Sequence, residues 1–206
     1  MDNNEEVKKY VETCREEFWQ EVFKHEVDYL VSHLKDSRNV LSVGCGPAAI
    51  EGALTEHGFN VTGLDVSREA LKCAPDKVRT VACRAEDMEF PASSFDAVIF
   101  VASLQFVEDY RKALEKAAQV LRPEGKIILM LLNPQSNFFK EKTAEPDSYV
   151  NFIRHKNLQE IEEAAAVYFS ISGEYILGIK GDKIFAGNDP SSAALYVING
   201  KRVKRF

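Results

Sequence analysis

Two glycines and one aspartate have the residue types and spacing of a nucleoside-binding site. Gly44 and Gly46 directly follow the apolar stretch 39–43, and Asp65 closes the next apolar stretch, 60–64. Glycines allow a tight turn and let the backbone approach a ligand without an intervening Cβ. An acid about 20 residues further on can accept hydrogen bonds from two ribose hydroxyls. The pattern indicates a nucleoside cofactor. The alternative is that Gly44 and Gly46 merely make a tight strand-to-helix turn and that Asp65 merely caps the helix beginning near Ser67.

Several other cofactor and catalytic motifs are missing. The sequence contains no G-x-x-x-x-G-K-[ST], no Y-x-x-x-K and no G-x-S-x-G, which argues against a P-loop NTPase, a short-chain dehydrogenase and an α/β-hydrolase. Ala49 stands at the third position of the dinucleotide fingerprint, where glycine is usual. A nicotinamide-dependent oxidoreductase therefore remains as a rival.

The elements that must position these residues alternate between strands and helices. Buried-strand patterns occur at 39–43, 60–64, 78–82, 96–102 and 126–132, and helical patterns at 48–57, 67–73 and 109–121. This order predicts βαβ units and a parallel sheet. Further along, a helix near 157–166 and strands at 167–179 and 194–198 predict an antiparallel C-terminal hairpin. The fold class is thus α/β, a three-layer sandwich with a Rossmann-like, mostly parallel sheet of seven strands.

The N-terminal segment has a different texture. Apolar residues three or four positions apart over 5–35 predict amphipathic helix. We expect residues 1–35 to form a helical lid over the cofactor cleft and residues 36–206 to form the cofactor-binding domain. The alternatives are that this segment completes the core or forms a dimer contact, so the oligomeric state, monomer or homodimer, is left open.

Composition narrows the function classes. The 206 residues carry a formal charge of −6, no basic-then-apolar leader and no long apolar stretch, so we expect a soluble, cytoplasmic protein of one domain without a membrane partner. The cysteines and histidines show no metal-ligand spacing, and no metal is expected. Nucleic acid is an unfavoured partner. The basic cluster is predicted to be a solvated tail and consists of Lys201, Arg202, Lys204 and Arg205.

Four stretches, in chain order, resemble the class I S-adenosylmethionine-dependent methyltransferases, specifically the group with a type 11 methyltransferase domain. They are Val40–Gly46, Gly63–Ser67, Ala85–Val98 and Leu121–Lys126. The resemblance implies S-adenosylmethionine as cofactor and methyl transfer to a small-molecule acceptor. RNA or protein methylation, and a non-catalytic S-adenosylmethionine-binding protein, are the alternatives. The implied cofactor-binding residues are Gly44, Cys45, Gly46, Asp65, Val66, Ala85, Glu86, Asp87 and Val101.

The sequence departs from the family pattern at two polar positions. Ser42 stands where relatives often have an acid that organises the methionine end of the cofactor. Arg84 occupies the place of an Asp that often contacts the adenine amino group, and Glu86 or Asp87 is the candidate to take over that hydrogen bond.

The residues that would contact the methyl acceptor are harder to identify from the sequence. Gln105 follows the fourth strand at the edge where ligands bind in open α/β sheets, and it is a weak candidate for a catalytic role, with a plain loop residue as the alternative. Aromatic side chains are the other candidates for the acceptor pocket, although many of them are expected to be core. They are Phe18, Trp19, Phe138, Phe139, Tyr149 and Phe152.

Overall fold

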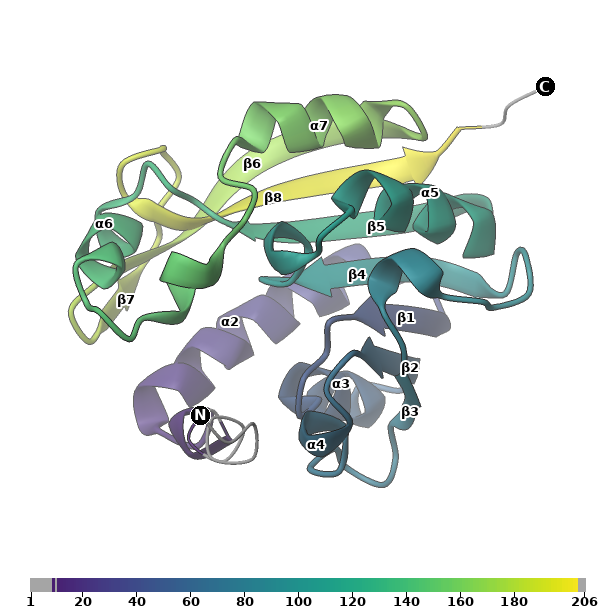
Figure 1. The fold of residues 1–206 in the computed structure, drawn as a ribbon, viewed down its shortest axis with the longest axis horizontal. Coiled ribbons are helices and arrows are strands. Elements are labelled where there is room, and N and C mark those ends of the chain that lie inside the picture. The colour runs from purple at the N-terminus through teal and green to yellow at the C-terminus, as the bar shows by residue number, and fades with distance from the viewer. Residues whose placement is uncertain (1–8, 10, 204–206) are drawn as a thin grey trace.

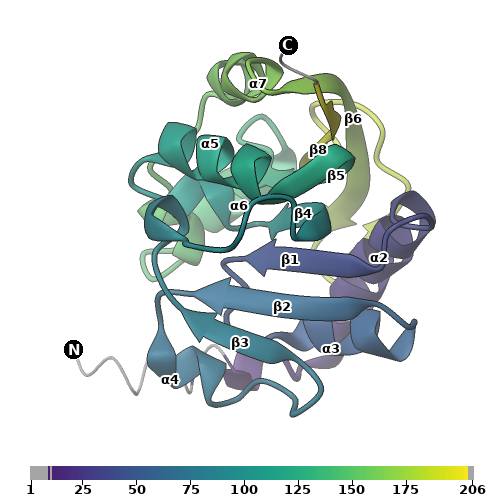
Figure 2. The same ribbon diagram turned by 90° about the vertical axis from the view of Figure 1, so that its right-hand side faces the viewer.

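A computed structural model describes residue 9 and residues 11–203. Within this part of the chain, eight strands form one sheet in the order β3-β2-β1-β4-β5-β8-β6-β7. Figure 2 shows the run from β3 to β6. The strands are β1 (Asn39–Val43), β2 (Asn60–Asp65), β3 (Arg79–Ala82), β4 (Phe95–Val101), β5 (Leu121–Leu132), β6 (Phe169–Lys180), β7 (Lys183–Phe185) and β8 (Ala193–Arg202).

The strands from β3 to β5 are parallel, whereas β8 is antiparallel to both β5 and β6. The Rossmann-like sheet with antiparallel C-terminal strands is therefore confirmed. The expected count of seven strands is corrected to eight, because β7 folds back on β6 and pairs Ile184 with Ile179. Three residues are too few for a periodic pattern to reveal.

Helices cover both faces of the sheet (Figure 1). One face carries α2 (Glu17–His33), α3 (Ala49–Glu56) and α6 (Asn137–Thr143), and the other carries α5 (Tyr110–Val120) and α7 (Leu158–Ala166). Two buried apolar clusters, one on each face, fill the space between these layers. The remaining short elements are α4 (Arg68–Leu71), η1 (Ala85–Asp87), η2 (Leu104–Phe106) and η3 (Tyr149–Phe152).

Two segments differ from the sequence-based expectation. The β5 strand begins at Leu121 rather than 126, because Leu121 pairs with Phe95 before the register shifts at Ala97. The polar stretch after Asn133 is not a plain linker but contains α6, which Ser136 caps by accepting a hydrogen bond from the Phe139 N–H. Figure 1 shows α6 beyond the end of the sheet toward which β4 runs.

From Val22 onward, α2 is part of the core. Its buried side chains Val22, Val27 and Leu30 pack with apolar residues of β1, β4, β5 and α3. Core completion is one of the alternatives that the sequence left open for residues 1–35. A lid role stays a prediction and is now confined to the start of the segment, of which residues 1–8 and 10 lie outside the described residues. Over the part that the structure describes, no helix is long and apolar enough to cross a membrane.

Replacing Leu30 by alanine should therefore destabilise the whole domain. Leu30 is fully buried, and removing a buried leucine leaves a cavity that costs about 2–5 kcal/mol. Urea denaturation measures the loss, with Lys24→Ala on the exposed side of the same helix as the control that should change the free energy of unfolding by less than about 0.5 kcal/mol. Equal, small effects of both changes would mean that α2 is dispensable to the core.

Candidate functional site

The loop after β1 has the conformation that glycine permits. Gly44 has φ +78° and Gly46 has φ +53°, values that L-residues rarely adopt. A Cβ at Gly44 would lie 2.5 Å from the Cβ of Ser103, the residue that follows β4 by two positions. The Ser103 hydroxyl in turn donates to the Val43 carbonyl at 2.6 Å. Gly44 is thus required by close packing of two loops at the carboxyl edge of the sheet.

The backbone donors of this loop are satisfied within the protein. The N–H groups of Gly44 and Cys45 both donate to the Leu64 carbonyl, at 2.7 and 3.1 Å. The Gly46 N–H donates to Asp65 Oδ2 at 2.8 Å, and the Ser67 N–H donates to Asp65 Oδ1 at 2.8 Å. Each carboxylate oxygen accepts one of these bonds and retains a second lone pair. Asp65 therefore fixes the loop and can still accept hydrogen bonds from a ribose.

Cys45 points its thiol back into the sheet. Its sulfur occupies the space beside Gly63 of β2, where a Cβ would lie 2.7 Å from Sγ. Burial, with the nearby charges of Glu51 and Asp65, raises the pKa of the thiol far above its ordinary value. Because the thiolate is the nucleophilic form, this side chain is a packing group rather than a nucleophile.

A buried carboxyl group lies beneath the loop. Glu51, in the first turn of α3, is 3% exposed and accepts a hydrogen bond from Ser42 Oγ at 2.5 Å. Burial is the main cause that raises the pKa of Glu51 to about 7. Ser42 stands where relatives often carry an acid, and the bond to Glu51 brings a carboxyl group from the neighbouring helix to the same place.

A second buried carboxyl group comes from α2. Glu26 is 5% exposed, and burial, followed by the charge of Glu51, raises its pKa to about 8. Glu26 also acts on the Tyr149 hydroxyl of η3, whose pKa is raised by burial first and then by Glu26. The charge of Glu51 on α3 therefore acts on the carboxyl group of Glu26 on α2.

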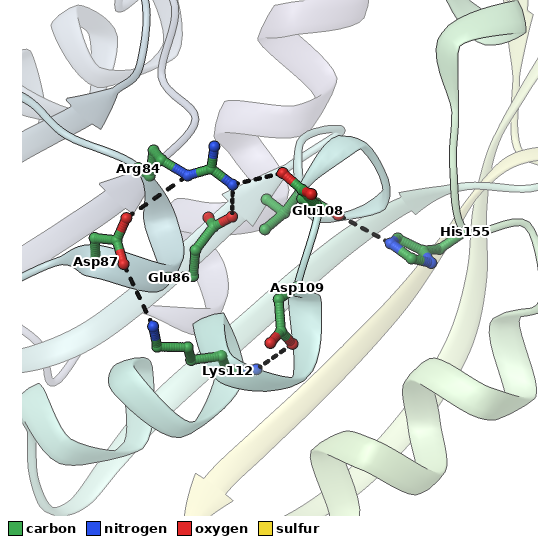
Figure 3. A network of polar contacts seen from close by, with 8 residues as sticks. Arg84, Glu86, Asp87, Glu108, Asp109, Lys112 and His155 are labelled. Atoms are coloured by element: carbon green, nitrogen blue, oxygen red, sulfur yellow. Dashed lines mark hydrogen bonds and ion pairs between the residues drawn. The ribbon is translucent and has the colours of Figure 1, made fainter.

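The adenine-side loop is organised by a charge network (Figure 3). The exposed Arg84 guanidinium pairs with Glu86 at 2.5 Å, with Glu108 at 2.7 Å and with Asp87 at 3.6 Å. Asp87 also faces Lys112 at 3.4 Å. Both candidate acids of η1 are thus paired with cations, and each carboxylate keeps lone pairs that can accept a hydrogen bond from an adenine amino group.

Other predicted cofactor residues lie along the same edge of the sheet. Val66 directly follows Asp65 and is 72% exposed, an unusual exposure for a large apolar side chain beside a buried strand. Val101 ends β4 and is half-buried, and Ala85 begins η1 with its side chain buried. An exposed valine next to a half-buried aspartate suits the apolar face and the ribose of one nucleoside.

Gln105 is a structural residue, which corrects its candidacy for catalysis. Its side chain is 0% exposed, and its amide nitrogen donates to the carbonyls of Leu132 and His155 at 3.1 and 3.2 Å. Its amide oxygen accepts from the Leu132 N–H at 2.7 Å. Gln105 therefore joins η2 to the end of β5, and its fully buried side chain is not accessible to an acceptor.

The aromatic candidates divide between core and cleft. Phe138 and Phe139 are buried in the core cluster. Trp19 of α2 packs edge-on against Tyr149 of η3, with ring centroids 6.5 Å apart, whereas Phe152 is mostly exposed. The start of α2 and the segment after β5 therefore meet on one side of the site.

Residues 41–129, which contain this whole edge of the sheet, match the family model described as a methyltransferase domain. The chain therefore contains a methyltransferase domain over these residues, and its fold is similar to those of solved S-adenosylmethionine-dependent methyltransferases. Its cofactor is S-adenosylmethionine, as the sequence resemblance implied.

Relatives of this methyltransferase cover different shares of its length. An uncharacterised protein of Methanocaldococcus jannaschii is 28% identical over 148 residues, which are 68% of this chain and 69% of the relative. A ubiquinone biosynthesis O-methyltransferase of Alkalilimnicola ehrlichii is 33% identical over 131 residues, 58% of this chain and 53% of the relative. The match thus spans only about half of that enzyme.

A solved structure from Thermotoga maritima has the same fold over nearly the whole chain. It is described as an S-adenosylmethionine-dependent methyltransferase and possible histamine N-methyltransferase. It superposes with a TM-score of 0.75 at 19% identity and covers 97% of this chain and 98% of the other.

The two buried glutamates are the site residues that the sequence analysis missed. Glu51 lies between Ile50 and Leu54 on α3, and Glu26 lies beside Val27 on α2. The signal that could have revealed Glu51 is the absence of an acid at Ser42, which leaves a place for a carboxylate from the next helix. Nothing in the helical pattern marks Glu26, because glutamate is common on solvent-facing positions of the same helix.

The two glutamates should make folding stability fall as the pH rises from about 5 to 8. In this window an unfolded chain has ionised both groups, whereas the folded protein retains their protons up to pKa values of about 7 and 8, so raising the pH favours the unfolded state. Urea denaturation across the pH range measures the slope. Glu51→Gln or Glu26→Gln should flatten it, and Glu56→Gln, exposed on α3, should not. Identical slopes in all four proteins would contradict the burial of these charges.

Proposed function

We propose that this methyltransferase transfers the methyl group of S-adenosylmethionine to a small-molecule acceptor. The observation that carries the proposal is the carboxyl group of Glu51 beneath the glycine loop. S-adenosylmethionine carries a sulfonium and an ammonium group, and a carboxylate at this place stabilises a cation. The ubiquinone-pathway relative and the Thermotoga structure both bear names of small-molecule methyltransferases, which supports the acceptor class.

The same observation argues against a dinucleotide cofactor. A pyrophosphate needs free N–H groups at the N-terminus of the first helix. Here the N–H groups of the loop before the helix, those of Gly44, Cys45 and Gly46, already donate to Leu64 and Asp65. Glu51 places a buried carboxyl group in the first turn of α3 itself. An anionic ligand would meet a carboxyl group where it requires donors.

The proposed cofactor contacts follow the edge of the sheet. Asp65 would accept from the ribose hydroxyls, Val66 would cover one face of the adenine, and Glu51 would neutralise the methionine end. Glu86 or Asp87, each held in place by a cation, would accept from the adenine amino group beside backbone groups of η1. The remaining predicted residues, Gly44, Cys45, Gly46, Ala85 and Val101, would shape the cleft through backbone and packing.

The alternative of RNA methylation loses its main support. The part of the basic cluster that the structure describes, Lys201 and Arg202, ends β8 beside Lys126 and Phe169. This is the edge of the sheet opposite the carboxyl ends of the parallel strands. The alternative of a non-catalytic binding protein rested on Ser42 and Arg84, and Glu51 compensates for the first of these changes.

The function itself is tested by release of S-adenosylhomocysteine. Full-length protein incubated with S-adenosylmethionine and a panel of amines, thiols, phenols and carboxylic acids should turn over at least one class faster than the acceptor-free control. Binding of the cofactor without turnover of any acceptor, including RNA and protein, would favour the non-catalytic alternative.

Asp65→Ala should weaken S-adenosylmethionine binding by about 1.5–3 kcal/mol, because two hydroxyls lose a charged acceptor. Asp65→Asn, which retains one oxygen to accept a hydrogen bond, should lose less. Calorimetry measures both, and Asp76→Ala, exposed before β3, is the control with unchanged affinity. Wild-type affinity in the Asp65→Ala protein would remove Asp65 from the site.

Cofactor affinity should rise as the pH is raised from about 6 to 8. Glu51 is protonated below a pKa of about 7, and only its ionised form attracts a cation, so the ligand binds better once the proton has left. Titrations at several pH values measure the trend. In Glu51→Gln the affinity should be lower and the rise weaker. A rise of unchanged size in that variant would assign the pH dependence to another group.

A further inference from the structure

A cavity of about 290 Å³ lies between α2 and the β6–β7 strands. Five of its lining residues, Ile176, Leu177, Ile184, Phe185 and Ala186, belong to the strands and the turn after them, and all are apolar. The other three, His25, Glu26 and Tyr29, come from α2. The volume is at the lower end of the range for ligand sites, roughly 300–1,000 Å³, and it suits a small molecule with an apolar body.

The polar group of this cavity is an unpartnered carboxyl. Glu26 is 95% buried, and among the described residues no hydrogen bond or ion pair reaches its carboxyl group. A ligand that donates a hydrogen bond or carries a positive charge would supply the partner that this carboxyl group lacks.

The wall beside Glu26 is rigid. The Tyr29 hydroxyl donates to Glu174 of β6 at 2.6 Å and accepts from the Asn199 amide of β8 at 2.6 Å. These bonds hold α2 against the antiparallel strands, so the cavity does not depend on a mobile side chain. The aromatic faces of Tyr29 and Phe185 can also attract a cation.

The titratable groups around the cavity favour a cationic ligand over an anionic one. The lining contains no lysine or arginine. The titratable groups around Glu26 are His25 and Tyr29 on its own helix, Glu51 on α3 and Tyr149 on η3. A carboxylate ligand would meet these acids without a strong cation, whereas an ammonium group would find an acceptor in Glu26.

We propose that this cavity binds the methyl acceptor, and that the acceptor is a small primary or secondary amine with an apolar or aromatic body. The inference rests on the proposed function. Glu26 connects the cavity to the cofactor side, since its helix packs with α3 in one core cluster and Glu51 of α3 is bonded to Ser42 just before the glycine loop. Glu26 binds the ammonium group and takes its proton.

Methyl transfer to the amine needs no reactant other than S-adenosylmethionine. An ammonium ion loses one proton to the Glu26 carboxylate, and the nitrogen lone pair then forms a bond to the methyl carbon. The carbon–sulfur bond breaks, and its electron pair stays on sulfur as a neutral thioether. The methylated product leaves as an ammonium ion, and the proton on Glu26 passes to solvent. The Glu26 carboxylate thus removes the proton and positions the free amine for transfer.

Binding of phenethylamine and of its neutral isostere 2-phenylethanol tests the site. Calorimetry on the full chain should show at least tenfold tighter binding of the amine, with proton release at pH 7 revealed by two buffers of different ionisation enthalpy. Glu26→Gln should remove the preference and the proton release, and leave 2-phenylethanol binding unchanged. Glu21→Gln, exposed on the same helix, should behave as wild type. Equal affinities for the two probes in wild type, or a preference that survives Glu26→Gln, overturns the proposal.

Two further measurements separate this inference from the proposed function. The rise of amine affinity with pH between about 6.5 and 8.5 in the wild-type protein is a second readout that needs no variant. S-adenosylmethionine binding is titrated in parallel, and its absence would refute the proposed function. Cofactor binding with no methylation of arylalkylamines would refute the amine site alone, as would an amine that binds without being methylated.

Discussion

The carboxyl group of Glu51 is the constraint around which the site is arranged. It is buried below a loop whose own N–H groups are already bonded, and an ionised carboxylate at such a place is unfavourable unless a positive charge accompanies it. Ser42 and the start of α3 hold the group in position. A cleft built in this way favours a cationic nucleoside and disfavours a pyrophosphate, although the surrounding βαβ architecture is shared with dinucleotide-binding folds.

The rest of the structure keeps this carboxyl group in place and dry. From Val22 onward, α2 covers one face of the sheet and contributes Glu26, whose pKa is raised by burial first and then by the charge of Glu51. Asp65 ties the glycine loop to the end of β2, and Ser103 ties it to the end of β4. The three loops therefore form one connected edge. Gln105 joins η2 to the end of β5 through two further hydrogen bonds.

The sequence predicted the parallel half of the sheet closely. Strands such as 39–43 and 96–102 are buried on both faces and therefore consist of continuous apolar runs. Such a run can be recognised in the sequence without knowing which strands lie beside it. Asp65 was also predictable, because its place is fixed by chain spacing from the glycines. Glu51 and Glu26 were not, since a helical pattern cannot distinguish a buried glutamate from an exposed one. Their burial is decided by the packing of α2 and α3 against each other.

Gln105 and the N-terminal segment illustrate the same limit. The sequence correctly brings Gln105 to the carboxyl edge, but only the tertiary structure shows that its amide faces β5 rather than the cleft. Likewise, the apolar stripe of α2 predicts a buried face and not what covers it. The loop at 181–182 gives too little signal for the short strand that follows it, so the eighth strand was absent from the prediction.

The central claim is that the cleft accepts a cationic nucleoside and rejects an anionic dinucleotide. Calorimetric titration of the full-length protein with S-adenosylmethionine and, separately, with NADH at pH 7.5 compares the two directly. The account predicts saturable binding of S-adenosylmethionine and no binding of NADH at the same concentrations. Saturable binding of NADH, with none of S-adenosylmethionine, would contradict it.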